Sequence, residues 1–277
     1  MARFALLLGG GGSVGIAWEN AVLAGLADGC GLDPADAAVI VGTSAGSAVG
    51  ADMALGKDPH DALAFDGAGG SAQRTGVPDL ETGPFAEIIA LMMSPEARTP
   101  EKTAKIGALA READTAFGED EFVERFRKSV GTDAWPAVDL RITAASCSTG
   151  EPKVWTAADG IGLARAVASS CAIPGFFPVV SHGGDHFMDG ARGRNYHARI
   201  LADCDVDVAI YVGPKVAVPG VARLILDDMD AIAETGVAVH TILGSPALEA
   251  AGMNLMDVSR RPEAFEIGLA DGAEHGA

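Results

Sequence analysis

A serine flanked by glycines near the N-terminus has the residue types and spacing that nucleophilic catalysis requires. Gly42-Thr43-Ser44-Ala45-Gly46 follows the apolar run 38–41 and precedes residues compatible with a helix. A serine on a sharp strand-to-helix turn projects its hydroxyl, and small neighbours permit the strained backbone. With 36 glycines in the chain, a G-x-S-x-G pattern alone would be weak evidence. Its position after a buried-type strand makes Ser44 the candidate nucleophile.

A second glycine-rich segment, Gly9 to Gly15, directly follows another apolar run. Bare backbone N–H groups in such a loop can hold an oxyanion, and Gly10, Gly11 and Gly12 are the candidates. The spacing G-x-G-x-x-G also fits a dinucleotide-binding loop, which needs an acidic residue at the end of the second strand. Ser44 and its neighbours stand there instead. We therefore expect no cofactor, and the two segments together indicate acyl transfer from an ester.

The candidate base is an aspartate, because a serine hydroxyl is a poor nucleophile until a neighbour accepts its proton. Asp189 follows a short strand and precedes Gly190, where the backbone can turn sharply. Alone it would be an ordinary turn carboxylate. Burial beside an apolar acyl channel would raise its pKa from about 4 and suit it to acid–base chemistry. His197 and His240 remain alternative bases for a Ser-His-Asp triad, although neither stands in a turn after a strand.

In their order along the chain, these motifs resemble those of the patatin-like phospholipases. That family has a glycine-rich loop on the first βα turn, G-x-S-x-G on the second, and a later Asp-Gly-Gly or Asp-Gly-Ala. The resemblance covers roughly residues 4–55 and 140–212. The matching segments are 10–15, 42–46 and 189–191, with further similarity in 169–175 and at Asn195.

This resemblance implies a Ser–Asp dyad that works without histidine, metal or cofactor. Ser44 would attack the ester carbonyl, Asp189 would accept its proton, and the N–H groups of the glycine loop would bind the tetrahedral oxyanion. The residues that support these motifs are Gly15, Gly42, Gly46, Gly190 and Asn195.

Two positions depart from the family pattern. Val14 stands where many relatives carry arginine, which removes a cation beside the glycine loop. Phosphate-bearing headgroups would then be held less well, or by another cation such as Arg192 or Arg194. His197 stands where proline is frequent. Neither change affects the candidate nucleophile or base, so the expected substrates are phospholipids, lysophospholipids or other acyl esters.

Composition limits the partners. A net charge of −18 without a basic stripe argues against nucleic acid and against strong electrostatic adhesion to anionic bilayers. We expect a lipid substrate, met in transient contact with a membrane surface or as a monomer or micelle. The four cysteines have no metal-like grouping, which favours reduced thiols. No run reaches the roughly 18 apolar residues of a membrane span, and the first apolar run is too short for a signal peptide, so we expect a cytoplasmic protein.

The alternation of apolar runs predicts an α/β fold with a mostly parallel central sheet and helices on both faces. The resemblance to the patatin-like phospholipases implies a three-layer architecture related to that of the α/β-hydrolases. We expect one domain over 1–277, with a helical cap or insertion at 57–136 and a frayed tail at 271–277. Expected strands are 3–8, 38–42, 139–146, 153–156 and 206–212. Expected helices are 15–29, 45–56, 84–93, 100–113, 119–130 and 161–171, and further helices are expected to fill 220–257.

Three functions fit these observations. The preferred one is a serine lipid acyl hydrolase with a Ser–Asp dyad. A Ser-His-Asp esterase is one alternative, and a non-catalytic lipid-binding or regulatory protein on the same fold is another. No residue pattern bears on oligomeric state.

Overall fold

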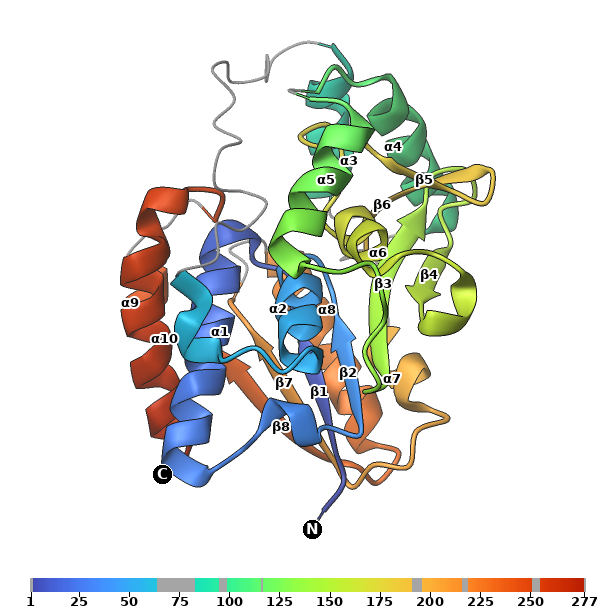
Figure 1. The fold of residues 1–277 in the computed structure, drawn as a ribbon. Coiled ribbons are helices and arrows are strands. Elements are labelled where there is room, and N and C mark those ends of the chain that lie inside the picture. The colour runs from blue at the N-terminus through green and yellow to red at the C-terminus, as the bar shows by residue number, and fades with distance from the viewer. Residues whose placement is uncertain are drawn as a thin grey trace.

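The computed structural model describes residues 2–63, 83–94, 99–115, 117–190, 196–215, 219–250 and 255–276. Within these residues an eight-stranded sheet has the order β5-β6-β3-β2-β1-β7-β8, with β4 also paired to β3 (Figure 1). The neighbouring strands β3, β2, β1, β7 and β8 run parallel to one another. The edge formed by β4, β5 and β6 is antiparallel. The expected α/β class with a mostly parallel sheet is confirmed. The strands are Phe4–Leu8 (β1), Val39–Gly42 (β2), Leu140–Ser146 (β3), Pro152–Trp155 (β4), Val180–His182 (β5), Asp185–Asp189 (β6), Val208–Gly213 (β7) and Ala238–Leu243 (β8).

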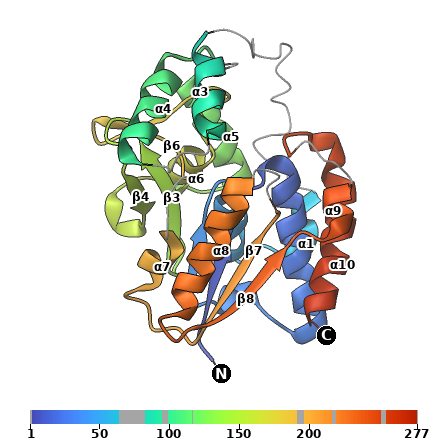
Figure 2. The same cartoon turned by 180° about the vertical axis from the view of Figure 1, so that it is seen from behind.

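Helices cover both faces because the central strands are apolar on both sides, as buried parallel strands usually are. Leu6 and Leu8 of β1 pack in one layer, whereas Leu7 packs in the other with Val41. The first layer contains α1, α2, α5, α6 and α10; the second contains α7 and α8, seen in front of the sheet in Figure 2. In the described part of the chain, no helix is both long and apolar enough to span a bilayer. The helices of the two layers are Gly12–Cys30 (α1), Ala45–Ala54 (α2), Glu119–Val130 (α5), Leu163–Ser170 (α6), Tyr196–Leu201 (α7), Pro219–Ala233 (α8) and Arg261–Gly276 (α10).

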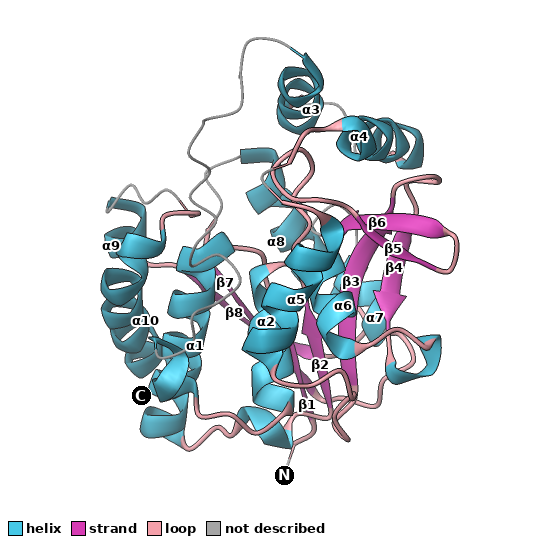
Figure 3. Ribbon diagram, turned by 45° about the horizontal axis from the view of Figure 1, so that its top comes forward, coloured by secondary structure: helices cyan, strands magenta, loops and turns pink. Residues whose placement is uncertain are grey.

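The middle block contains the three helices expected there, α3 (Gly83–Met93), α4 (Pro100–Glu112) and α5. Figure 3 shows α3 and α4 together at one end of the molecule, beside β5 and β6. They share a small core with that edge, in which Ile88 and Ile106 pack with Met188. The apolar face of α5 instead belongs to the main core of the domain. A cap that opens and closes therefore remains a prediction, and it concerns α3 and α4 rather than α5.

The region 220–257 is not wholly helical, because β8 lies between α8 and α9 (Pro246–Ala250). Strand β8 pairs in parallel with β7 along its whole length. Its residues Val239, Thr241 and Ile242 are β-branched, and such side chains favour strands. The expectation of helices throughout this region was wrong here, since a short strand at the sheet edge gives only a brief signal beside two helical patterns.

The C-terminal segment does not fray at 271, since α10 continues to Gly276. The indole Nε1 of Trp18 in α1 donates a buried hydrogen bond of 2.7 Å to the carboxylate of Asp271. Helices α1 and α10 approach closely, because a Cβ at Gly272 would lie 2.4 Å from the carbonyl oxygen of Val22. A polar, glycine-bearing tail is thus ordered by tertiary contacts. Short 3-10 turns occupy Pro34–Asp36, Pro59–Leu63, Ala157–Asp159 and Val258–Arg260.

Candidate active site

Ser44 occupies a strained turn between β2 and α2. Its backbone has φ 54° and ψ −119°, and it is the sole non-glycine residue with positive φ in the described part of the chain. Such strain concentrates at functional sites, and a nucleophile elbow requires it. The two glycines of the pattern are required sterically. A Cβ at Gly46 would lie 2.4 Å from the carbonyl of Leu8, and one at Gly42 would lie 2.6 Å from the Cα of Ser47.

The Ser44 hydroxyl meets the Asp189 carboxylate, although 145 positions separate the two residues. Oγ of Ser44 donates a hydrogen bond of 2.8 Å to Oδ2 of Asp189. The two residues are 6% and 5% exposed, so their contact lies in a site that largely excludes water. The structure therefore brings the candidate nucleophile and the candidate base within direct proton-transfer distance.

The register of β3 explains this meeting. Gly42 of β2 pairs with Ile142 of β3, so Ser44, two residues further, reaches the level of Ala144. Asp189, the last residue of β6, pairs with Ala144 from the opposite side. Gly190 follows without a side chain because a Cβ there would lie 2.4 Å from the carbonyl of Thr143.

The end of α6 holds the backbone of the elbow. The Ser44 N–H donates to Oγ of Ser170 at 2.8 Å. The Ser44 carbonyl accepts from Oγ of Ser47 at 2.7 Å and from Sγ of Cys171 at 3.1 Å. Burial raises the pKa of the Cys171 thiol, which keeps this donor protonated. Sequence reasoning assigns no role to Ser47, Ser170 or Cys171, although the segment 169–175 resembles the family.

The glycine loop begins α1 beside the elbow. Gly12 is the first residue of this 19-residue helix and has φ 59°. In the described part of the chain, the N–H groups of Gly10, Gly11 and Gly12 donate to no acceptor, as is usual at a helix start. The carbonyl of Gly9 accepts the N–H of Gly46 at 2.8 Å, which connects the loop directly to the elbow. Free N–H groups at the positive end of a helix favour a developing negative charge.

The remaining predicted residues divide into three groups. Gly15 packs against the elbow, since a Cβ on it would lie 3.5 Å from that of Ala45. Asn195, Arg192 and Arg194 lie outside the described residues. The two candidate histidines lie within the described ranges, and neither is hydrogen-bonded to Ser44. Nδ1 of His197 lies 2.7 Å from Oδ2 of Asp228, and His240 is exposed on β8. Among described residues, no group of three or more His, Cys, Asp or Glu side chains could hold a metal.

Fold and site together define an α/β protein with a serine elbow, and comparisons with known proteins give its family. The family model of patatin-like phospholipases matches residues 6–202, so the chain belongs to this family. No curated protein sequence matches it. Two solved structures are similar to it: VipD from Legionella pneumophila, with 13% identity and a TM-score of 0.48, and the type III effector protein ExoU, with 17% identity and a TM-score of 0.44. Each alignment covers 99% of this chain but only 66% of VipD and 53% of ExoU.

Proposed function

We propose that the protein is a serine lipid acyl hydrolase that cleaves carboxylic esters with Ser44 and Asp189. The observation that carries this proposal is the 2.8 Å hydrogen bond between the two side chains at a strained elbow. Membership in the patatin-like phospholipase family supports lipid acyl esters as the substrate class. Phospholipids, lysophospholipids and other acyl esters are the candidates, reached in transient contact with a membrane surface.

In the first half-reaction, Oγ of Ser44 bonds to the ester carbonyl carbon while its proton passes to Asp189. The carbonyl π electrons move onto oxygen, and the N–H groups of Gly10, Gly11 and Gly12 stabilise the resulting oxyanion. The tetrahedral intermediate then collapses and breaks the ester C–O bond. Asp189 returns the proton to the departing alkoxide, which leaves as an alcohol or a lysolipid.

In the second half-reaction, water attacks the acyl-Ser44 ester and gives a proton to Asp189. Collapse of this second intermediate releases the fatty acid, and the proton returns to Oγ of Ser44. The same carboxylate thus accepts and donates a proton in each half-reaction, as a single general acid–base group does. The contacts of Ser170, Cys171 and Ser47 hold the elbow backbone during both attacks.

Activity-based labelling tests this proposal. A fluorophosphonate probe is applied to the wild type, Ser44→Ala and Asp189→Asn, followed by a mixed panel of phospholipids, lysophospholipids and neutral esters. We expect no labelling of Ser44→Ala and labelling at least about tenfold slower for Asp189→Asn, because the base is lost. Ser259→Ala and Asp230→Asn, at positions outside the site, are the matched controls.

Three results would contradict the proposal. Labelling that persists in Ser44→Ala would remove Ser44 as nucleophile. Lipid binding by the wild type without labelling or turnover would favour a non-catalytic lipid-binding protein. Loss of turnover in His240→Ala, with unchanged folding, would favour a histidine-dependent esterase.

A further inference from the structure

A cluster of three side chains, two of them buried, lies in the layer of α7 and α8 and takes no part in the proposed reaction. Nδ1 of His197 is 2.7 Å from Oδ2 of Asp228, which also accepts the backbone N–H of His197 at 2.9 Å. The His197 ring packs edge-on against Tyr211, with centroids 6.0 Å apart. Asp228 is 4% and Tyr211 2% exposed. Burial raises the pKa of Asp228, but the bonds and charge of His197 outweigh this, so its pKa is lowered.

The phenol of Tyr211 fills space that two glycines leave open. Its ring lies against Gly213, two residues further along β7, where a Cβ would be 2.7 Å from the phenol oxygen. The same oxygen lies at Gly9, at the end of the neighbouring strand β1, where a Cβ would be 2.5 Å away. Real Cβ atoms do not approach heavy atoms so closely, so the ring is in contact with the backbone of both glycines.

Gly9 is the residue from which the glycine loop departs. Its N–H donates to the carbonyl of Val212 at 2.9 Å, and its carbonyl accepts the N–H of Gly46 at 2.8 Å. The next three residues supply the N–H groups that would bind the oxyanion. A side chain that fixes Gly9 therefore fixes both the start of that loop and its connection to the elbow.

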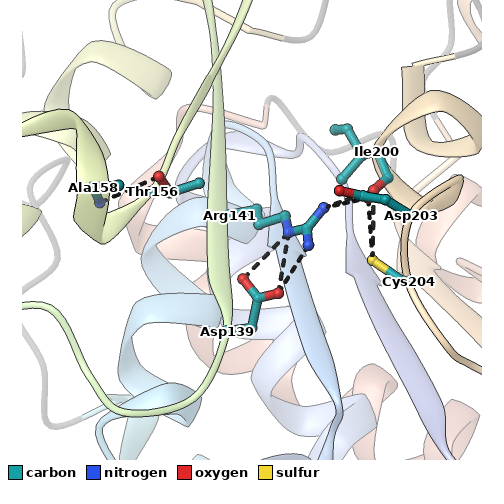
Figure 4. Close-up of polar contacts among 7 residues, drawn as sticks. All are labelled: Asp139, Arg141, Thr156, Ala158, Ile200, Asp203 and Cys204. Carbon is teal, nitrogen blue, oxygen red and sulfur yellow. Dashed lines mark hydrogen bonds and ion pairs between the residues drawn. The ribbon is translucent and has the colours of Figure 1, made fainter.

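The helix that carries His197 is fixed at both ends. At its first turn, Asp228 accepts the N–H groups of His197 and Ala198. At its last turn, Nη1 of Arg141 donates to the carbonyl of Ile200 at 2.7 Å, while the rest of the guanidinium binds Asp139 (Figure 4). The His197 ring that packs against Tyr211 is thus carried by a helix that is held from two other elements.

We propose that Tyr211, supported by His197 and Asp228, is a positioning residue that holds the glycine loop in the geometry for oxyanion stabilisation. This inference rests on the proposed function. It follows from the contacts because a loop N–H that moves by about 1 Å loses much of its effect on the transition state, and such misplacement can cost about a hundredfold in rate. The substrate itself need not touch the ring.

The test is a double-mutant cycle between Tyr211 and Gly9, read as kcat and KM for p-nitrophenyl butyrate. Tyr211→Leu should lower kcat about tenfold or more, with KM changed less than about threefold, because the loss lies in the transition state. Gly9→Ala should also lower kcat, since its Cβ would collide with the phenol. In Tyr211→Leu/Gly9→Ala the new methyl group occupies space that the phenol has vacated. The kcat of this double variant should therefore be at least about threefold higher than the value expected if the two single fold-reductions in kcat simply multiplied.

Met229→Ala is the matched control, because Met229 is buried at 3% in the same layer and belongs to α8. It should lower the melting temperature and leave kcat unchanged. Additive effects in the cycle, or a Tyr211→Leu enzyme within about twofold of the wild-type kcat, would overturn the inference.

Hydrogen exchange separates failure of this inference from failure of the proposed function. Amide exchange of Gly9, Val14 and Gly15, whose N–H groups are hydrogen-bonded, should accelerate at least about tenfold in Tyr211→Leu and remain unchanged in Met229→Ala, whether or not the protein hydrolyses an ester. If the wild type has no esterase activity, amide exchange alone tests the positioning role of Tyr211. Unchanged exchange in Tyr211→Leu would then refute that role.

Discussion

Glu19 is a buried acid whose ionisation should set how the stability of this protein depends on pH. It lies on α1, is 0% exposed, and neither carboxyl oxygen has a hydrogen-bond partner among the described residues. Loss of hydration by burial raises its pKa well above the ordinary value of a glutamate. The folded protein therefore keeps this group as a neutral acid at pH values where the unfolded chain ionises it.

The sign and size of the effect follow from proton linkage. Below about pH 4.3 Glu19 holds its proton in both the folded and the unfolded state, so its ionisation does not lower the free energy of unfolding. Above that pH the folded state binds one more proton than the unfolded state, so the free energy of unfolding falls by about 1.4 kcal/mol per pH unit. The fall ends where the pH passes the folded-state pKa. Burial also raises the pKa of Asp52, but that group is common to the wild type and any Glu19 variant.

Glu19→Gln removes the titration and keeps the shape of the side chain. Wild type and variant are unfolded in urea at about pH 5.5, 6.5 and 7.5. The free energy of unfolding of the variant should rise relative to that of the wild type by about 1.4 kcal/mol for each pH unit, up to a plateau. Glu234→Gln, at an exposed glutamate, is the matched control. If the stability difference between Glu19→Gln and the wild type does not rise at all with pH, Glu19 is either ionised in the folded state or hydrated, and its assignment as a neutral buried acid is wrong.

Two further predictions concern residues outside the site. Asp271→Ala should lower the free energy of unfolding by about 1–3 kcal/mol in urea titrations, because it leaves the buried indole N–H of Trp18 without its acceptor; an unchanged value would mean that the end of α10 contributes no stability. His240→Ala should retain esterase turnover within about twofold, because His240 lies exposed on the edge strand β8 and the Ser44 hydroxyl is bonded to Asp189.

The local parts of this molecule were predictable because local rules determine them. The apolar runs before Gly9 and before Ser44 became β1 and β2, and the glycines that follow both became turns into helices. Gly183 and Gly184, both with positive φ, form the turn that joins β5 to β6. In each case the sequence neighbours themselves supply the steric reason.

The unpredicted parts depend on partners far away in the sequence. Strand β8 is stabilised by its pairing with β7, and the end of α10 is stabilised by Trp18, which lies 253 positions earlier. Ser170 and Cys171 hold the elbow from the end of another helix. No periodicity in the chain marks such contacts, since each depends on a partner that only the completed fold brings near.

The distance between Ser44 and Asp189 depends on register more than on either motif. Strands β2 and β6 flank β3, so the two side chains must reach across one intervening strand, about 4.8 Å from each neighbour. They can do so because Gly42, two residues before Ser44, pairs with Ile142, and Asp189 pairs with Ala144, two residues further along the same strand. A slip of β6 by one residue would turn the carboxylate to the opposite face of the sheet. The pairing of Ala145 with Met188 and of Ser146 with Phe187, which sets the register of β6 on β3, therefore holds Asp189 at the level of Ala144.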